Sequence, residues 1–148
     1  MRHPTRPSAL AALWICGATV LAGCGTSVSL DEPIEGPTWR LANVAQQPVA
    51  PGSDPQRDAR LQFDGARVTG SSGCNQLSGG YQRSGSSLRI GPLAATRMAC
   101  ADPARAALES DFLNALQGTS DYSLLGRQLI LMNGAGRTLA VLESAAER

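Results

Sequence analysis

The sequence predicts an α+β domain, mainly β, in which a curved antiparallel sheet packs against one helix. Three features lead to this fold class. Apolar residues alternate with polar ones over most of the chain from Pro37 onward, as expected for strands with one buried face. The connections between these stretches are short and rich in glycine, which favours antiparallel hairpins. Only residues 104–117 have apolar side chains at helical spacing.

Nine short segments have the alternation of half-buried strands. In order along the chain they are residues 39–44, 60–63, 67–70, 80–83, 88–90, 92–96, 122–124, 128–131 and 138–142. Asp64-Gly65, between the second and third segments, suits the tight turn of a β-hairpin. Residues 46–55 are expected to form a loop because they contain three prolines and a glycine. Residues 70–75 are expected to form an irregular crossing.

The expected helix has clear signals at both ends. Asp102 is a good N-cap because its carboxylate can accept hydrogen bonds from the free amides of the first turn. Pro103 suits the first helical position, and Gly118 is expected to be the C-terminal cap. The apolar stripe consists of Leu108, Phe112, Leu113 and Leu116. This stripe is expected to lie on the sheet.

The N-terminal residues have the organisation of an export signal. Arg2 and Arg6 precede an apolar stretch, residues 9–21, which is too short to span a bilayer. It ends in Leu21-Ala22-Gly23-Cys24, which resembles the lipobox of bacterial lipoproteins. The resemblance implies that residues 1–23 are a removed signal peptide and that Cys24 is lipidated. It also implies that Cys24 holds the chain to a membrane through its lipid.

Residues 24–36 are polar and acidic and are expected to form a flexible tether, with the folded domain at residues 37–144. Gly25, rather than aspartate, follows the expected lipidated cysteine. By the sorting rule of such lipoproteins in well-studied Gram-negative bacteria, this residue favours the outer membrane over inner-membrane retention. We therefore expect an outer-membrane lipoprotein that faces the periplasm. The alternative is an ordinary secretory signal with an incidental cysteine.

The residue types in the chain exclude several classes of catalysis. All thirteen basic residues are arginines, and the only histidine, His3, lies in the expected leader. The domain therefore has no Ser-His-Asp or Cys-His arrangement, no Schiff-base lysine, no histidine-ligated metal and no P-loop. After residue 23, eleven arginines and twelve acidic residues give a formal side-chain charge of −1, which does not favour binding to nucleic acid. We expect no cofactor and no metal.

Cys74 and Cys100 are the cysteines that remain in the expected domain. An even pair in an exported domain predicts a disulfide. The alternative is a reactive or sensing thiol, activated by an arginine or by the start of the helix after Cys100. Two thiolates without an imidazole would leave a zinc site half built.

Three polar residues invite a functional interpretation. Asn75 is expected to be a turn residue whose amide bonds local backbone, with a ligand contact as the alternative. Arg97 is expected to be half-buried and paired with an acid. Glu109 would act as a general acid or base only beside a second carboxylate, and Asp111 points to another side of the helix. Most such carboxylates are expected to be solvated surface charges.

Four short motifs precede or flank the expected helix. They are Trp39-Arg40-Leu41, Gly73-Cys74-Asn75, Gly80-Tyr81 and Thr96-Arg97-Met98-Ala99-Cys100. This ordered set, followed by a helix and a β-meander, resembles the META domain of HslJ-type bacterial envelope proteins over about 105 residues. The resemblance implies a mostly β fold built as a partly open barrel with one helix, and it implies no catalytic activity. The motif residues to which it gives structural roles are Gly73, Asn75, Gly80, Tyr81, Thr96 and Met98.

Together these observations predict a non-enzymatic envelope lipoprotein. Its expected role is to bind an envelope protein or to act in an envelope stress response, with which some members of the family are associated. One alternative is a binder of a small apolar ligand in the mouth of the curved sheet. Another is an inhibitor of an envelope hydrolase that contacts its target through residues 46–55.

Overall fold

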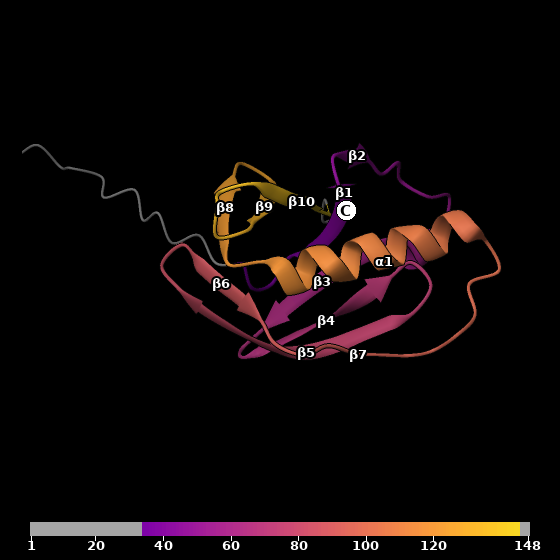
Figure 1. The fold of residues 1–148 in the computed structure, drawn as a ribbon, viewed down its shortest axis with the longest axis horizontal. Helices are drawn as coiled ribbons and strands as arrows, with labels where there is room; N and C mark the ends of the chain where they lie inside the picture. Colours follow the sequence, from indigo (N-terminus) through magenta and orange to yellow (C-terminus); the bar gives the residue numbers. More distant parts are fainter. Residues whose placement is uncertain (1–33, 146–148) are drawn as a thin grey trace, which may run out of the picture.

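The computed structural model describes residues 34–145, which form an eight-stranded antiparallel barrel, two short extra strands and one α-helix (Figure 1). This architecture confirms the predicted fold class, α+β and mainly β. The strands are β1 (Thr38–Val44), β2 (Gln47–Pro48), β3 (Ala59–Asp64), β4 (Arg67–Ser72), β5 (Gln76–Ser84), β6 (Ser87–Ile90), β7 (Ala94–Ala95), β8 (Asp121–Leu125), β9 (Gln128–Met132) and β10 (Thr138–Ser144). The α-helix is α1 (Pro103–Gly118), and a 3-10 helix covers Pro55–Arg57.

The barrel closes because its first and last strands pair. The strand order is β10-β9-β8-β6-β5-β4-β3-β1, and β1 pairs back with β10 in antiparallel register from Trp39 opposite Ser144 to Val44 opposite Ala140. The seam between β6 and β8 is much shorter, since only Ser87 and Asp121 are registered partners. β2 and β7 lie outside this ring, on β1 and β5.

Buried side chains from the strands and from α1 form one apolar cluster. The strand alternation that the sequence predicts is clear on β3, where Leu61 and Phe63 are buried and Gln62 and Asp64 are exposed. Phe63 is fully buried and contacts the Tyr81 ring edge to face, with ring centroids 5.0 Å apart. The barrel interior is thus occupied by side chains, which disfavours the alternative of an apolar ligand in the sheet.

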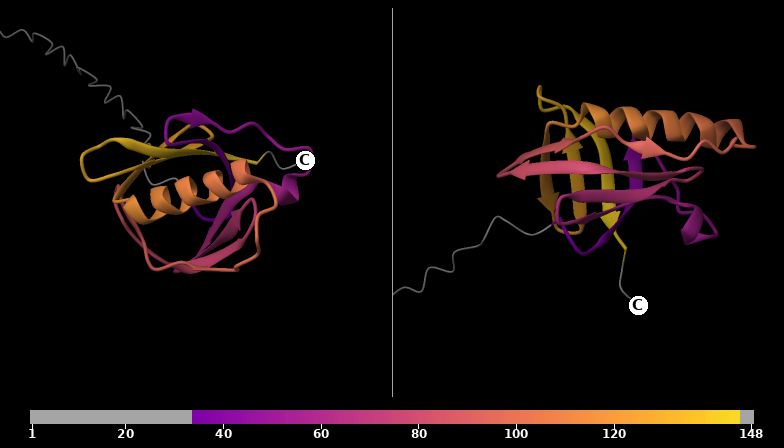
Figure 2. Two further views of the ribbon diagram at one scale, coloured as in Figure 1. Left: turned by 45° about the vertical axis from the view of Figure 1, so that its right-hand side comes forward. Right: turned by 90° about the horizontal axis from the view of Figure 1, so that it is seen from below.

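α1 contacts both halves of the barrel. It touches β1, β9 and β10 on one side and β4 and β6 on the other, and Figure 2 shows it lying between these strands. Phe112, Ala115 and Leu116 are buried, and Leu108 and Leu113 pack against the core, which confirms the predicted stripe. The C-terminal cap differs from the prediction. Gly118 is the last helical residue, and the cap is Thr119, whose N–H donates to the Leu116 carbonyl at 3.3 Å.

Three segments differ from their predicted local structure. Within the expected loop at residues 46–55, Gln47 and Pro48 form β2 and pair with β1. The strand predicted at residues 67–70 continues through Ser71 and Ser72 instead of giving way to an irregular crossing, because Ser71 pairs with Gln76 across a tight turn to β5. At the N-terminus, packed structure extends before Pro37. Ile34 is fully buried, and its carbonyl accepts a hydrogen bond from Trp39 Nε1 at 2.7 Å.

The expected signal peptide, the lipidation site Cys24 and most of the expected tether lie outside the described residues. Within residues 34–145, no helix has both the length and the hydropathy that crossing a bilayer would require. The expected outer-membrane attachment therefore stays a prediction.

The N-cap of α1 provides a first test of the helix signals. Asp102 accepts a hydrogen bond from the Ala104 N–H at 2.9 Å. We expect Asp102→Ala to lower the free energy of unfolding by about 1 kcal/mol, because that amide loses its partner. Urea denaturation followed by circular dichroism measures the change. Asp102→Asn keeps an acceptor and should stay close to the wild type, and equal losses in both variants would contradict the capping role.

Candidate functional site

Most of the predicted motif residues meet at one place, which we call the motif cluster. It joins the turn after β4, the segment between β7 and α1, and the second turn of α1. Its members are Ser72, Gly73, Cys74, Asn75, Thr96, Met98, Cys100 and Glu109.

The backbone requires two glycines here, one in the turn after β4 and one within β4. Gly73 has φ +92°, a left-handed conformation that other residues rarely adopt. At Gly70, a Cβ would lie 2.1 Å from the Arg60 carbonyl oxygen, so only glycine lets β3 and β4 approach this closely. These glycines place the Cys74 and Asn75 side chains toward the chain that precedes α1.

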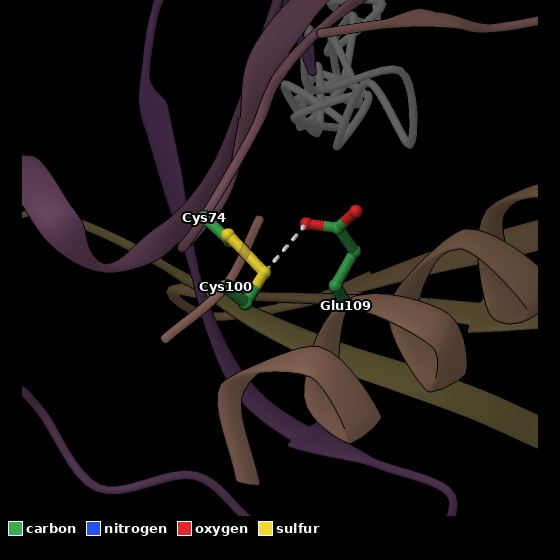
Figure 3. A group of neighbouring side chains, drawn as sticks. All are labelled: Cys74, Cys100 and Glu109. Carbon is green, nitrogen blue, oxygen red and sulfur yellow. Dashed lines mark hydrogen bonds between the residues drawn. A yellow bond between two sulfur atoms is a disulfide. The ribbon is translucent and has the colours of Figure 1, made fainter. Parts of the chain in front are cut away.

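The two cysteines form the predicted disulfide. Cys74 and Cys100 are bonded, with their Cα atoms 5.8 Å apart, and Glu109 points toward them from α1 (Figure 3). Cys100 Sγ lies 3.9 Å from Glu109 Oε2. A disulfide sulfur carries no hydrogen, so this approach is a contact and not a hydrogen bond. The reactive-thiol alternative is therefore not supported by the oxidised structure.

Asn75 makes the largest set of contacts in the motif cluster. Its side chain is 3% exposed, and Oδ1 accepts from the Met98 N–H at 2.7 Å and from Thr96 Oγ at 2.8 Å. Nδ2 donates to the Met98 carbonyl at 3.3 Å and to the Glu109 carboxylate at 3.0 Å. The amide thus pairs with backbone 23 residues away, whereas the sequence suggested local backbone.

Glu109 and Ser72 complete the motif cluster. Ser72 Oγ donates to Glu109 Oε2 at 2.5 Å and accepts from the Asn75 N–H at 2.9 Å. Both oxygens of Glu109 therefore have donors. Glu109 is therefore not among the carboxylates that are solvated surface charges, since it joins α1 to Ser72 and Asn75.

The same residues form a group of metal-ligand types. Ligand atoms of Cys74, Cys100 and Glu109 all lie within 4.8 Å of one another. The sulfurs, however, are bonded to each other, and a cysteine binds a metal as a thiolate. Glu109 is also occupied by Ser72 and Asn75. In this oxidised form the group is a structural junction and not a metal site.

Two surface grooves lie on either side of the segment before α1. One has a volume of about 630 Å³ and is lined by Arg57, Cys74 and Arg105 among others. The other has a volume of about 590 Å³ and is lined by Leu93 and Glu109 among others. Met98 and Ala99 line both grooves, so the segment forms the ridge between them. The Met98 side chain is 66% exposed.

Gly80 and Tyr81 lie farther along β5, away from the motif cluster. Tyr81 is buried, and its hydroxyl donates to Glu35 Oε1 at 2.5 Å. Burial and this hydrogen bond to a carboxylate raise the pKa of Tyr81 from 10.0 to about 12. Tyr81 is thus a core residue that contacts Phe63 and binds Glu35 in the segment before β1.

The sequence profile of the META domain matches residues 32–146. This chain belongs to the META domain family. The matched range contains all the residues that the structure describes. No curated protein matches the chain.

Solved structures with the same fold are similar to this META domain. One NMR structure shares 26% sequence identity, with a TM-score of 0.59, and covers 75% of this chain and 91% of its own. An NMR structure of a Burkholderia xenovorans protein shares 22% identity, with a TM-score of 0.60, over 97% and 99% of the two chains. A DUF4847 family protein from Bacteroides vulgatus shares 14% identity, with a TM-score of 0.55, over 80% and 99%. The last two likenesses concern the fold alone.

Tyr81 gives this META domain a testable pH dependence. We expect the ultraviolet absorbance change of its ionisation at about pH 12, instead of pH 10.0. The unfolded chain releases this proton first, so the free energy of unfolding should fall as the pH rises from 10 toward 12. Tyr81→Phe should remove the absorbance step and Tyr122→Phe should keep it. An ionisation of Tyr81 near pH 10 would contradict both the burial of its hydroxyl and the hydrogen bond to Glu35 as causes of the raised pKa.

Sequence reasoning missed two members of the motif cluster, Ser72 and Glu109. Glu109 precedes the buried Phe112 by three positions, which places both on one side of the helix, and this spacing was the available signal. The expectation that Arg97 is half-buried and paired with an acid is wrong. It is exposed, and it has no ion pair or hydrogen bond with any residue from 34 to 145.

Proposed function

We propose that this META domain is a non-enzymatic interaction module of the bacterial cell envelope. In this proposal the chain is exported as a lipoprotein, and the lipid on Cys24 holds it at the outer membrane, facing the periplasm. It binds an envelope protein there, in keeping with the stress-related roles of some members of the family.

The chemistry of the motif cluster supports a role without catalysis. Its cysteines are joined to each other, and its carboxylate accepts hydrogen bonds from Ser72 and Asn75. A nucleophilic cysteine needs a free thiolate, whereas these two sulfurs are bonded to each other, and both oxygens of the Glu109 carboxylate accept hydrogen bonds within the fold. The cluster instead holds the segment that carries Met98 in a fixed position.

The exposed ridge at Met98 is the observation that carries this proposal. Met98 stands 66% exposed, and its segment lines two surface grooves, so a partner could contact this apolar side chain and the grooves together. The N–H and the carbonyl of Met98 both form hydrogen bonds with the Asn75 side chain. These bonds fix the backbone that carries the Met98 side chain. Methionine adapts its shape to a binding partner. This combination fits a protein-binding surface.

Crosslinking in intact cells tests this role. A photoreactive amino acid replaces Met98, and in a matched control it replaces Leu125, whose side chain is 67% exposed at the far hairpin. We expect a discrete adduct with an envelope protein from position 98 and none from position 125. Adducts that are absent at 98, or equal at both positions, would refute the role of this ridge.

The anchor needs a separate test. Cys24→Ser should release the chain from the membrane fraction into the periplasm, because one lipidated residue provides the attachment. Mass spectrometry of the wild-type N-terminus should find Cys24 carrying acyl chains. A wild-type chain that is soluble with an unmodified N-terminus would contradict the lipoprotein proposal.

An inhibitor of an envelope hydrolase is a second form of the same interaction role. Residues 50–57 are exposed, and Asp58 Oδ1 accepts from the Gly52 N–H at 2.9 Å, which fixes the loop. A rigid exposed loop suits insertion into an active-site cleft. Purified hydrolases of the envelope, assayed with and without the chain, would test this form.

A further inference from the structure

β7 leaves one backbone edge unpaired. It pairs with β5 alone, with Leu77 opposite Ala95 and Ser78 opposite Ala94. The next hydrogen bond, from the Thr96 N–H to the Gln76 carbonyl at 3.1 Å, fixes the alternation. In an antiparallel pair, the residue beside such a bonded residue directs its own N–H and C=O away from the partner strand. The backbone groups of Ala95 therefore face outward.

The Asn75 side chain extends this strand beyond its two assigned residues. Its amide accepts from the Met98 N–H and donates to the Met98 carbonyl, as a neighbouring backbone would. Positions 94, 96 and 98 thus bond inward, and positions 95 and 97 face outward. We call residues 92–99 the edge segment. Within the described chain, no hydrogen bond engages the outward groups of Arg97.

The edge segment is open to an approaching chain. Ala94, Ala95, Thr96, Arg97 and Met98 are all exposed. Alanine side chains are small enough to let another backbone come within hydrogen-bond distance. Natural proteins usually protect such edges, because an uncovered edge is a template for pairing with another strand.

The charge around the edge segment indicates which kind of partner strand could pair with it. Residues 91–101 contain no acidic residue, and Arg97 has no partner among residues 34–145. The two nearby acids are engaged, Asp102 at the N-cap of α1 and Glu109 in the motif cluster. Arg105 lines the adjacent groove, together with Arg57, which pairs with Asp54 at 3.5 Å, and the capping residue Asp102. A second copy of this edge would bring no carboxylate to Arg97, whereas an acidic peptide would supply one.

We propose that the edge segment binds an extended, acidic segment of a partner polypeptide as an added strand. The partner backbone pairs with Ala95 and Arg97, a carboxylate of the partner lies beside the Arg97 guanidinium, and an apolar side chain rests against Met98. This inference rests on the proposed interaction role and names the surface and the class of partner.

Selection from a library of random decapeptides displayed on phage tests the inference, with the purified, disulfide-bonded chain as the target. Synthetic copies of the enriched peptides are then titrated against three variants. Ala95→Pro removes the outward N–H from an edge position, where proline is tolerated. Arg97→Glu reverses the free charge, and Arg137→Glu is the matched control at an exposed turn. Thermal unfolding of each variant confirms that it folds.

We expect peptides enriched in aspartate and glutamate. They should bind Ala95→Pro and Arg97→Glu at least about tenfold more weakly than the wild type, and Arg137→Glu equally well. No enrichment over an unrelated protein, equal binding to Ala95→Pro, or self-association through this edge in sedimentation would overturn the inference. If the crosslinks from position 98 persist in that case, the interaction role stands and only strand addition falls.

Discussion

Replacing both Cys74 and Cys100 by alanine is expected to lower the free energy of unfolding by about 3.5 kcal/mol. The disulfide closes a loop of 26 residues that contains β5, β6 and β7. Without it, the unfolded chain gains the conformational freedom of that loop. A typical domain is stable by about 5–15 kcal/mol, so the loss is a large share of the total. Urea denaturation of the oxidised protein measures it.

The reduced wild type provides the control for this prediction. A thiol reductant should shift the urea midpoint of the wild type to that of the double variant and leave the double variant unchanged. Compared with the oxidised wild type, both the reduced wild type and the double variant should show a steeper dependence of the unfolding free energy on urea, because their unfolded chains are more expanded. A double variant that unfolds at the oxidised wild-type midpoint would contradict the stabilising role of the disulfide.

This dependence fits the proposed location of the chain. A domain that owes several kcal/mol to one disulfide folds best where thiols are oxidised, as in the bacterial periplasm. It also separates two roles of the cysteines. Cys74 and Cys100 act on the stability of the domain, whereas Cys24 is proposed to act on its attachment.

Local signals in the sequence were sufficient for the hairpins and the helix. Asp64-Gly65 predicted the turn between β3 and β4, and Asp102 with Pro103 predicted the start of α1, because turn and cap chemistry depends on adjacent residues. Ser71 and Ser72 were missed as strand, since serine is not among the β-branched and aromatic residues that favour strands. Their place in β4 is fixed by pairing with β3 and β5, which no local pattern records.

The candidate site was predicted in part for the same reason. The family motifs identified Cys74, Asn75, Thr96, Met98 and Cys100. The cysteine count predicted the disulfide between Cys74 and Cys100. The contact between Asn75 and Glu109 joins residues 34 positions apart, and it depends on how α1 lies across the barrel. Spacing along the chain does not specify that orientation.

Asn75→Asp is expected to lower the free energy of unfolding by about 3 kcal/mol at neutral pH. The substitution preserves shape and replaces only the Nδ2 donor with an oxygen. Nδ2 lies 3.0 Å from both oxygens of Glu109, so the variant places two carboxylates in contact. The Met98 carbonyl loses its donor as well. Urea denaturation at several pH values measures the effect.

The matched control is Asn133→Asp, at the turn between β9 and β10. There the side chain acts as an acceptor, with Oδ1 accepting from the N–H groups of Ala135 and Arg137 at 3.1 and 2.9 Å. An aspartate keeps these bonds, so we expect a change within about 0.5 kcal/mol. Equal losses at positions 75 and 133 would show that donation by Asn75 is unimportant.

A second substitution distinguishes carboxylate repulsion from a general loss of packing. In Asn75→Asp combined with Glu109→Gln, an amide again faces a carboxylate, with the donor and acceptor exchanged. We expect this pair to regain part of the stability lost in Asn75→Asp, a non-additive effect typical of residues in direct contact. Acid pH should narrow the gap between Asn75→Asp and the wild type, because protonation of either carboxyl restores a donor between them. A gap that neither acid nor Glu109→Gln reduces would mean that the fold needs the shape of this side chain and not its hydrogen bond to Glu109.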